Sequence, residues 1–142
     1  ISPHQIIQLG LCTKNEWQQI SDLALKLFDL GTYIYNQIGL ILVDTKYEFG
    51  KDENDNTILI DELHTPDSSR LWIKETYEQN LQKHMPPQML DKEIIRRYLM
   101  ELGFKGDGIV PIVPMPKFIE LGKIYLDVAE KLIGKQMLVN LK

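Results

Sequence analysis

The stretch from Leu42 to Gly50, Leu-Val-Asp-Thr-Lys-Tyr-Glu-Phe-Gly, alternates in a way that is typical of a β-strand. Side chains of a strand point to its two faces in turn, so Asp44, Lys46 and Glu48 fall on one face. The leucines before them fall on the same face, which predicts a strand that leaves a core and enters a polar cleft. A row of charges on a rigid element suits a site that holds a cation and phosphates.

This strand is expected to belong to a β-hairpin. Its pattern extends over Leu40–Phe49, and a second strand is predicted over about Thr57–Glu62. The polar stretch Gly50–Asn56 between them would form the turn. The sequence leaves the register of the two strands open.

The register decides whether a site forms on the hairpin. Asp61 shares a face with Glu48 in about half of the possible registers. In those registers two carboxylates converge at a spot that suits Mg²⁺, and Lys46 adds a positive charge for a phosphate. The alternative is a solvated hairpin face with cross-strand ion pairs, which contribute little to stability.

Helices are predicted on both sides of the hairpin. Ser2 and Thr13 are each followed three residues later by Gln or Glu, which is the pattern of a capping box. The expected helices are a short one after Ser2, a long one from Thr13 to Gly39, and further ones over about Lys74–Lys83, from Asp91 to Gly103 and over about Lys117–Ile133. The sequence therefore predicts an α+β fold, with an antiparallel sheet packed against several helices in one domain over residues 1–142.

The composition narrows the class of protein. A chain of 142 residues is long enough to bury an ordinary core. Its net charge of −4 argues against binding to duplex nucleic acid, which favours a basic surface. Cys12 is the single cysteine, and no signal peptide or apolar segment of membrane-spanning length is visible. We therefore expect a cytoplasmic protein with no membrane partner.

The histidines offer no metal site by their spacing. His4, His64 and His84 are far apart in the sequence, and surface or capping positions are expected for them. His64 borders a loop with two hydroxyl groups and a guanidinium, so contact with a substrate is the alternative there.

The stretch Leu42–Gly50 resembles a signature of the SAICAR synthetase family (phosphoribosylaminoimidazole-succinocarboxamide synthase). The signature has two aliphatic residues, Asp, any residue, Lys, an apolar or aromatic residue, and Glu-Phe-Gly. Leu59–Glu62 and Thr65–Trp72 also look like this family, as do Asp91-Lys92 and the Gly-Asp-Gly segment. The resemblance covers roughly residues 2–134 and implies a two-lobed enzyme with its active site in the cleft.

The resemblance implies an ATP- and Mg²⁺-dependent ligase of de novo purine synthesis. The family joins L-aspartate to the carboxylate of an aminoimidazole ribonucleotide. Glu48 and Asp61 would be the Mg²⁺–ATP residues, and Lys46 would contact the nucleotide or a phosphate. Asp44 matches the signature as either a metal ligand or a partner of Lys46.

The same resemblance implies substrate contacts in the loop before Trp72. Ser69 and Arg70 look like contacts to the imidazole ribonucleotide, and Asp67 would hold the same substrate through its amine. A guanidinium beside two hydroxyl groups is suited to a carboxylate or a phosphate.

One part of the family pattern has no match in this sequence. Family members carry an N-terminal lobe with a glycine-rich segment that covers phosphates, and no glycine cluster precedes a helix here. Because the first residue is Ile1, we expect a C-terminal fragment with little or no ligase activity alone. The alternative is a non-catalytic scaffold that associates with itself, as a homo-oligomer, or with the missing lobe, and retains at most ribonucleotide binding.

Overall fold

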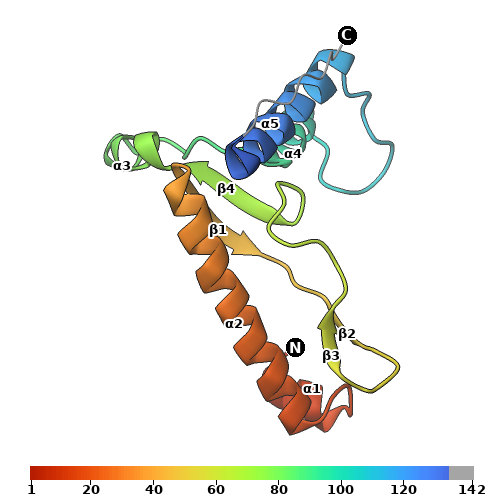
Figure 1. The fold of residues 1–142 in the computed structure, drawn as a ribbon. Coiled ribbons are helices and arrows are strands. Elements are labelled where there is room, and N and C mark those ends of the chain that lie inside the picture. Colours follow the sequence, from red (N-terminus) through yellow and green to blue (C-terminus); the bar gives the residue numbers. More distant parts are fainter. Residues whose placement is uncertain (135–142) are drawn as a thin grey trace.

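The computed structural model describes residues 1–134, and in that range it contains five helices and two small antiparallel sheets. This confirms the predicted α+β class. The predicted domain over residues 1–142 includes residues 135–142, which lie outside the described part. Figure 1 shows α1 and the β2–β3 hairpin at one end of the long helix α2, and α3, α4 and α5 at the other end.

Two capping boxes start the chain as predicted. In α1 (Pro3–Gln8) the Ser2 hydroxyl accepts from the Gln5 N–H, and the Gln5 side chain accepts from the Ser2 N–H. In α2 (Lys14–Gln37) Thr13 and Glu16 exchange the same pair of hydrogen bonds. Each box satisfies two N–H groups that a helix start leaves without partners.

The predicted strand over Leu40–Phe49 is split in two. Its first part, β1 (Leu40–Thr45), pairs antiparallel with β4 (Ser69–Ile73), which the sequence did not indicate as a strand. Its second part, β2 (Phe49–Lys51), pairs with β3 (Thr57–Leu59) in the expected hairpin. The residues between β1 and β2 lie outside both ladders.

A bulge in β1 also corrects the predicted faces. Leu42 pairs with Leu71 and Asp44 pairs with Arg70, so Val43 has no partner. Because paired residues share a face and neighbours in β4 alternate, Asp44 lies on the face opposite Leu42. The leucines therefore face the core, and the carboxylate faces outward.

The core lies at the β1–β4 end of the molecule. Its fully buried apolar members within the described range are Tyr35, Leu40, Leu42, Leu71 and Val128. They come from α2, β1, β4 and α5, so one small cluster holds segments that are distant in the sequence. The β2–β3 hairpin contributes no residue to it.

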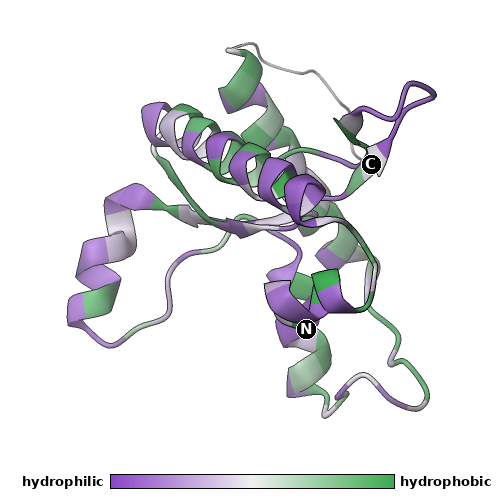
Figure 2. Ribbon diagram, turned by 90° about the horizontal axis from the view of Figure 1, so that it is seen from below, coloured by the Kyte–Doolittle hydropathy of each residue, from purple (hydrophilic) through white to green (hydrophobic). Residues whose placement is uncertain are grey.

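Three further helices complete the described chain. They are α3 (Lys74–Gln82), α4 (Glu93–Glu101) and α5 (Met115–Ile133). The start of α4 lies two residues after the predicted one, and α5 begins two residues earlier than predicted. Hydrophilic and hydrophobic residues alternate along the long helices (Figure 2), and no helix of residues 1–134 is long and apolar enough to cross a membrane.

Candidate functional site

Lys46, Glu48 and Asp61 come together between the two sheets. The backbone N–H of Ile60 donates to the Glu48 carbonyl at 3.0 Å, which extends the pairing beyond the β2–β3 ladder. The Lys46 ammonium contacts the Glu48 carboxylate and lies 3.4 Å from Asp61 Oδ2. The register sets Glu48 opposite Ile60, so Glu48 and Asp61 do not share a sheet face; both carboxylates reach Lys46 outside the ladder.

The three charged groups are accessible and influence one another. The side chains of Lys46, Glu48 and Asp61 are 63%, 49% and 39% exposed. Hydrogen bonds to Glu48 and then to Asp61 raise the pKa of Lys46, so its ammonium stays protonated. The Glu62 N–H and the Lys46 ammonium lower the pKa of Asp61, so this carboxylate stays ionised at neutral pH.

Asp44 forms a separate ion pair with Arg70 across β1 and β4. Arg70 Nε lies 2.9 Å from both carboxylate oxygens of Asp44, and Nη2 also contacts Oδ2. The guanidinium holds the pKa of Asp44 below its usual range, and Asp44 in turn raises the pKa of Arg70. Asp44 thus partners Arg70 and does not contact Lys46 among the ion pairs of residues 1–134.

Two carboxylates and a lysine are residue types that can hold Mg²⁺ and a nucleotide phosphate. Mg²⁺ commonly takes one or two protein carboxylates and completes its shell with phosphate oxygens and water. Glu48 and Asp61 offer two carboxylates, and Lys46 offers the charge for a phosphate. Within residues 1–134 no group of three or more Asp, Glu, His or Cys side chains is arranged to bind a metal by itself.

The loop before β4 is a turn held by side-chain hydroxyl groups. Ser69 N–H donates to the Thr65 carbonyl at 2.9 Å, and the Lys46 N–H donates to the Ser68 carbonyl at 3.3 Å. The Ser69 side chain is 4% exposed and donates to Thr45 Oγ1 at 2.9 Å. The bond from Lys46 to Ser68 joins this turn to residues 46–48, and the bond from Ser69 to Thr45 helps to hold β4 against β1.

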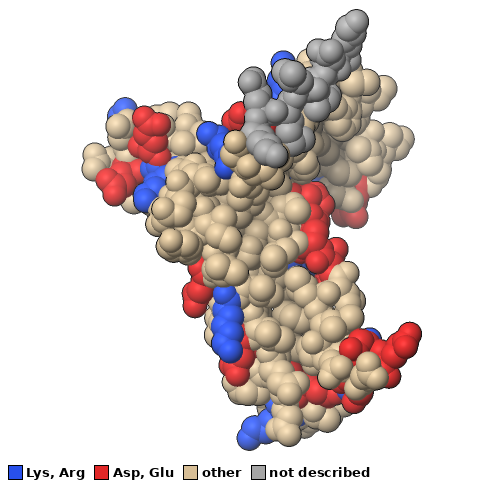
Figure 3. Space-filling view, viewed as in Figure 1, with Lys and Arg blue, Asp and Glu red and all other residues tan. Residues whose placement is uncertain are grey.

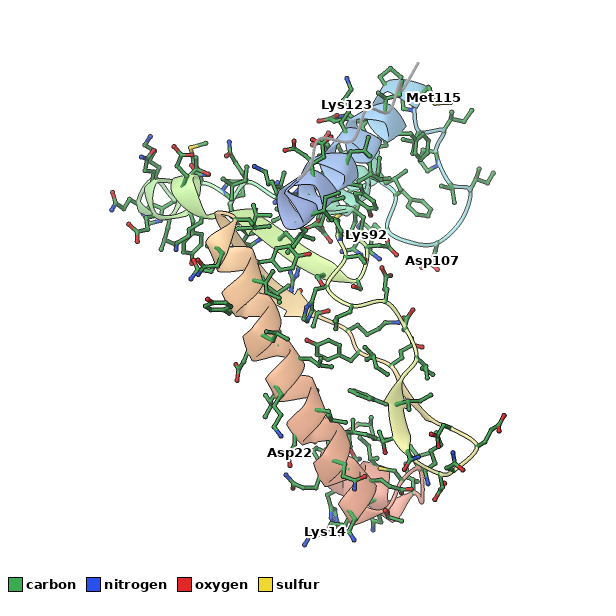
Figure 4. The ribbon with its side chains drawn as sticks, viewed as in Figure 1. Lys14, Asp22, Lys92, Asp107, Met115 and Lys123 are labelled. Atoms are coloured by element: carbon green, nitrogen blue, oxygen red, sulfur yellow. The ribbon has the colours of Figure 1, made fainter. Side chains whose placement is uncertain are left out.

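Asp67 and Arg70 line a polar hollow of about 410 Å³ with residues of α4 and its N-terminus. Lys92 pairs with Asp67 at 3.2 Å, and Figure 4 shows Lys92 near the start of α4. Lys92 and Arg96 are site residues that the sequence analysis did not assign. Their separation of four residues could have indicated a shared helix face.

Asp91 supports this hollow from the interior. It is 1% exposed, and it accepts from the Leu71 N–H at 3.3 Å and the Glu93 N–H at 2.7 Å. Burial raises the pKa of this carboxyl group. The residue thus connects β4 to the start of α4, where the sequence had predicted only a helix cap.

A second hollow of about 760 Å³ lies between α4 and α5. It shares Asp67, Lys92 and Arg96 with the polar hollow, while Leu99 and Phe118 contribute apolar walls. The two hollows therefore adjoin along the start of α4.

His64 lies in the interior, in contrast to the expected surface or capping position. It is 7% exposed, and its Nε2 forms a hydrogen bond with the Tyr47 hydroxyl. The Tyr35 hydroxyl donates to the His64 carbonyl. Within the described residues its ring contacts Tyr47 and lies close to Gly31 of α2.

Comparison with known proteins decides the family. The model of the SAICAR synthetase family matches residues 1–111. The chain belongs to the SAICAR synthetase family. This confirms the resemblance found in the sequence.

Relatives and solved structures agree with this assignment. A phosphoribosylaminoimidazole-succinocarboxamide synthase from Legionella pneumophila is 39% identical over 141 residues, which are 99% of this chain and 45% of the relative. A SAICAR synthase from Saccharomyces cerevisiae in complex with SAICAR has a TM-score of 0.76 and 29% identity, over 98% of this chain and 44% of that one. A SAICAR synthetase in complex with ADP has a TM-score of 0.69 and 28% identity, over 98% and 46% of the two chains. The chain thus spans less than half the length of these SAICAR synthetases.

Proposed function

We propose that this chain forms the C-terminal part of a SAICAR synthetase. The enzyme would join L-aspartate to the carboxylate of 5-amino-1-(5-phospho-D-ribosyl)imidazole-4-carboxylate with ATP and Mg²⁺, and release SAICAR, ADP and phosphate. The main support is the convergence of Lys46, Glu48 and Asp61 beside the turn that leads to Arg70. Family membership and relatives solved with ADP or SAICAR add to it.

The nucleotide side of the site would consist of the three convergent residues. Glu48 and Asp61 would hold Mg²⁺, which when bound offsets negative charge on the transferring phosphoryl group. Lys46 would move from these carboxylates to a phosphate oxygen. Beside Glu48 and Asp61 its pKa is raised, so Lys46 is an ammonium before it moves to the phosphate.

The ribonucleotide side would use the turn and the start of β4. Arg70 presents planar N–H donors that suit a carboxylate or a phosphate, so a bound anion would compete with Asp44 for them. Asp67 would accept from the amine of the same substrate. Fixing that substrate would orient its carboxylate for phosphorylation, after which the aspartate amine attacks the acyl carbon and phosphate leaves.

The remaining wall of the nucleotide site is proposed to come from an N-terminal lobe. The chain spans 45% of its Legionella relative, which leaves room for such a lobe in a complete enzyme. Exposed apolar side chains support an association surface, since Ile109 is 97% and Ile112 is 91% exposed. These exposed residues also favour the second candidate, a scaffold that associates with itself.

We also propose that the complete enzyme is located in the cytoplasm.

Calorimetric titration of the 142-residue chain tests whether it contains the ribonucleotide side of the site. We expect the ribonucleotide to bind, and Arg70→Ala to abolish binding because it removes the anion contact. Arg97→Ala is the matched control, because Arg97 is exposed and does not line the polar hollow. Failure of both Mg²⁺–ADP and the ribonucleotide to bind would leave only the scaffold.

Turnover in the complete natural polypeptide tests the metal assignment. Glu48→Gln and Asp61→Asn should each lower kcat by roughly a hundredfold or more, because each removes a charged ligand from the phosphoryl-transfer site. Glu53→Gln and Asp29→Asn are controls at exposed positions. Unchanged kcat in both site variants would contradict the assignment.

A further inference from the structure

A half-buried contact between the Tyr47 and His64 side chains links the two sides of the proposed site. Tyr47 lies between Lys46 and Glu48, and His64 begins the loop that leads to Arg70. The Tyr47 hydroxyl and His64 Nε2 are hydrogen bonded, and the two rings meet edge to face with centroids 5.5 Å apart. Neither residue belongs to the proposed ligand contacts of Lys46, Glu48, Asp61, Asp67 and Arg70.

His64 is held in place from several directions. The Tyr35 hydroxyl of α2 donates to the His64 carbonyl, and a Cβ on Gly31 of the same helix would overlap the His64 ring. The backbone of His64 has a φ of 53°, a left-handed conformation that a non-glycine residue adopts at some cost. The contacts from Tyr35 and Gly31 thus hold both the backbone and the ring of His64 against α2.

Tyr47 is the part of the Lys46–Glu48 segment that reaches the interior. The segment is outside the strand ladders, and the side chains on either side of Tyr47 are exposed. Backbone hydrogen bonds hold the segment at both ends, through the Lys46 N–H to Ser68 and the Glu48 carbonyl to Ile60. The hydroxyl contact to His64 is therefore a side-chain anchor between these ends.

We propose that Tyr47 and His64 are positioning residues that fix the distance between the nucleotide side and the ribonucleotide side of the site. The proposal rests on the proposed ligase function. Tyr47 holds Lys46 and Glu48, while His64 holds the start of the turn that carries Asp67 and Arg70. The pair touches neither ligand; it acts by keeping the phosphoryl donor aligned with the carboxylate that receives the phosphoryl group.

A positioning role predicts that loss of the contact lowers kcat and leaves KM nearly unchanged. Tyr47→Phe removes one hydroxyl and keeps the ring, so each side still binds its own ligand while their alignment is lost. In the complete natural polypeptide we expect kcat to fall by about ten- to a hundredfold, with each KM changed by less than about threefold. Tyr33→Phe removes a hydroxyl from an exposed position of α2 and should leave kcat unchanged.

Two substitutions of His64 test the same contact independently of backbone conformation. Glutamine and leucine carry a similar penalty at a positive φ, but only glutamine can accept a hydrogen bond from Tyr47. We expect His64→Gln to retain about tenfold more kcat, per folded molecule, than His64→Leu. The folded fraction is measured by circular dichroism on the same samples.

Each outcome decides one question. Equal kcat in Tyr47→Phe and Tyr33→Phe, or equal kcat in the two His64 variants, would overturn the positioning role. A loss of Tyr47→Phe activity that follows only its folded fraction would also overturn it, because a structural role has that effect. Absence of ligase activity in the unmodified polypeptide would instead refute the proposed function.

Discussion

The two sheets of this chain differ in what lies behind them. The β1–β4 pair is backed by the core, and Leu71 at its centre is fully buried. The β2–β3 pair has three residues in each strand and no buried residue. Acidic side chains gather near the tip of its turn (Figure 3), where Asp52 accepts bonds from the backbone of Asn54 and Asn56.

This difference divides the proposed site. Arg70 belongs to the core-backed pair, whereas Glu48 and Asp61 flank the short ladder. Local stability follows the density of buried contacts, so we expect the ribonucleotide side to be preformed and the nucleotide side to open more readily. The following substitutions test the contrast, from the largest expected effect to the smallest.

Truncation of a leucine in each sheet should separate the two regions most strongly. Leu71→Ala should lower the free energy of unfolding by about 2–5 kcal/mol, because it leaves a cavity in the core. Leu59→Ala in β3 removes the same atoms from a half-buried position and should cost less. Urea denaturation measures both values, and equal losses would remove the contrast.

Gly31→Ala tests the close approach of the core to the His64 loop. Alanine normally favours a helix interior, but here its Cβ would overlap the His64 ring and lie 2.9 Å from Leu42 Cδ2. We expect a net destabilisation of about 1–3 kcal/mol from overpacking. Thr32→Ala, at the adjacent exposed position, should be neutral or stabilising, so a stabilising Gly31→Ala would contradict the packing.

Thr13→Ala tests the end of the molecule that carries the hairpin. It removes the cap of α2 and should cost about 1 kcal/mol. Glu16 of the same box contacts Lys51 of β2, so the loss should extend to the hairpin. Hydrogen exchange should rise in residues 14–17 and 49–59 and stay unchanged in 69–73; a uniform rise would contradict local opening.

The smallest expected effect is a pH dependence from His64. Burial lowers the pKa of its imidazole below the ordinary value of 6.5, so the unfolded chain takes up a proton before the folded chain does. Stability from the neutral ring is present above pH 6.5 and is lost as the pH falls towards the folded pKa. The stability advantage of the unmodified chain over His64→Gln should therefore narrow on acidification. A gap independent of pH would contradict a buried neutral ring.

Local signals predicted the beginning of the fold well. The capping boxes at Ser2 and Thr13 depend on residues three apart, and both form as expected. Glu48 and Asp61 both lie beside Lys46, but the predicted shared sheet face did not form, because Glu48 stands opposite Ile60. Ligand contacts for these residues remain predictions.

Contacts between distant residues were not predictable in the same way. The pairing of Asp44 with Arg70 requires β4 to lie beside β1, and no turn signal connects those strands. The burial of His64 depends on the missing side chain of Gly31 in another element. A glycine in a helical stripe looks only like a weak point until its neighbour is known.

The unpaired Val43 has a consequence for sequence change in this chain. Deleting it would make Leu42 and Asp44 neighbours in a regular strand, and they would keep their present partners and their opposite faces. Val43 is thus the position at which β1 can lose a residue without changing the faces of its neighbours. Loss of Val43 should therefore be tolerated better than loss of the paired Ile41, which would move Leu40 to the opposite face of the strand.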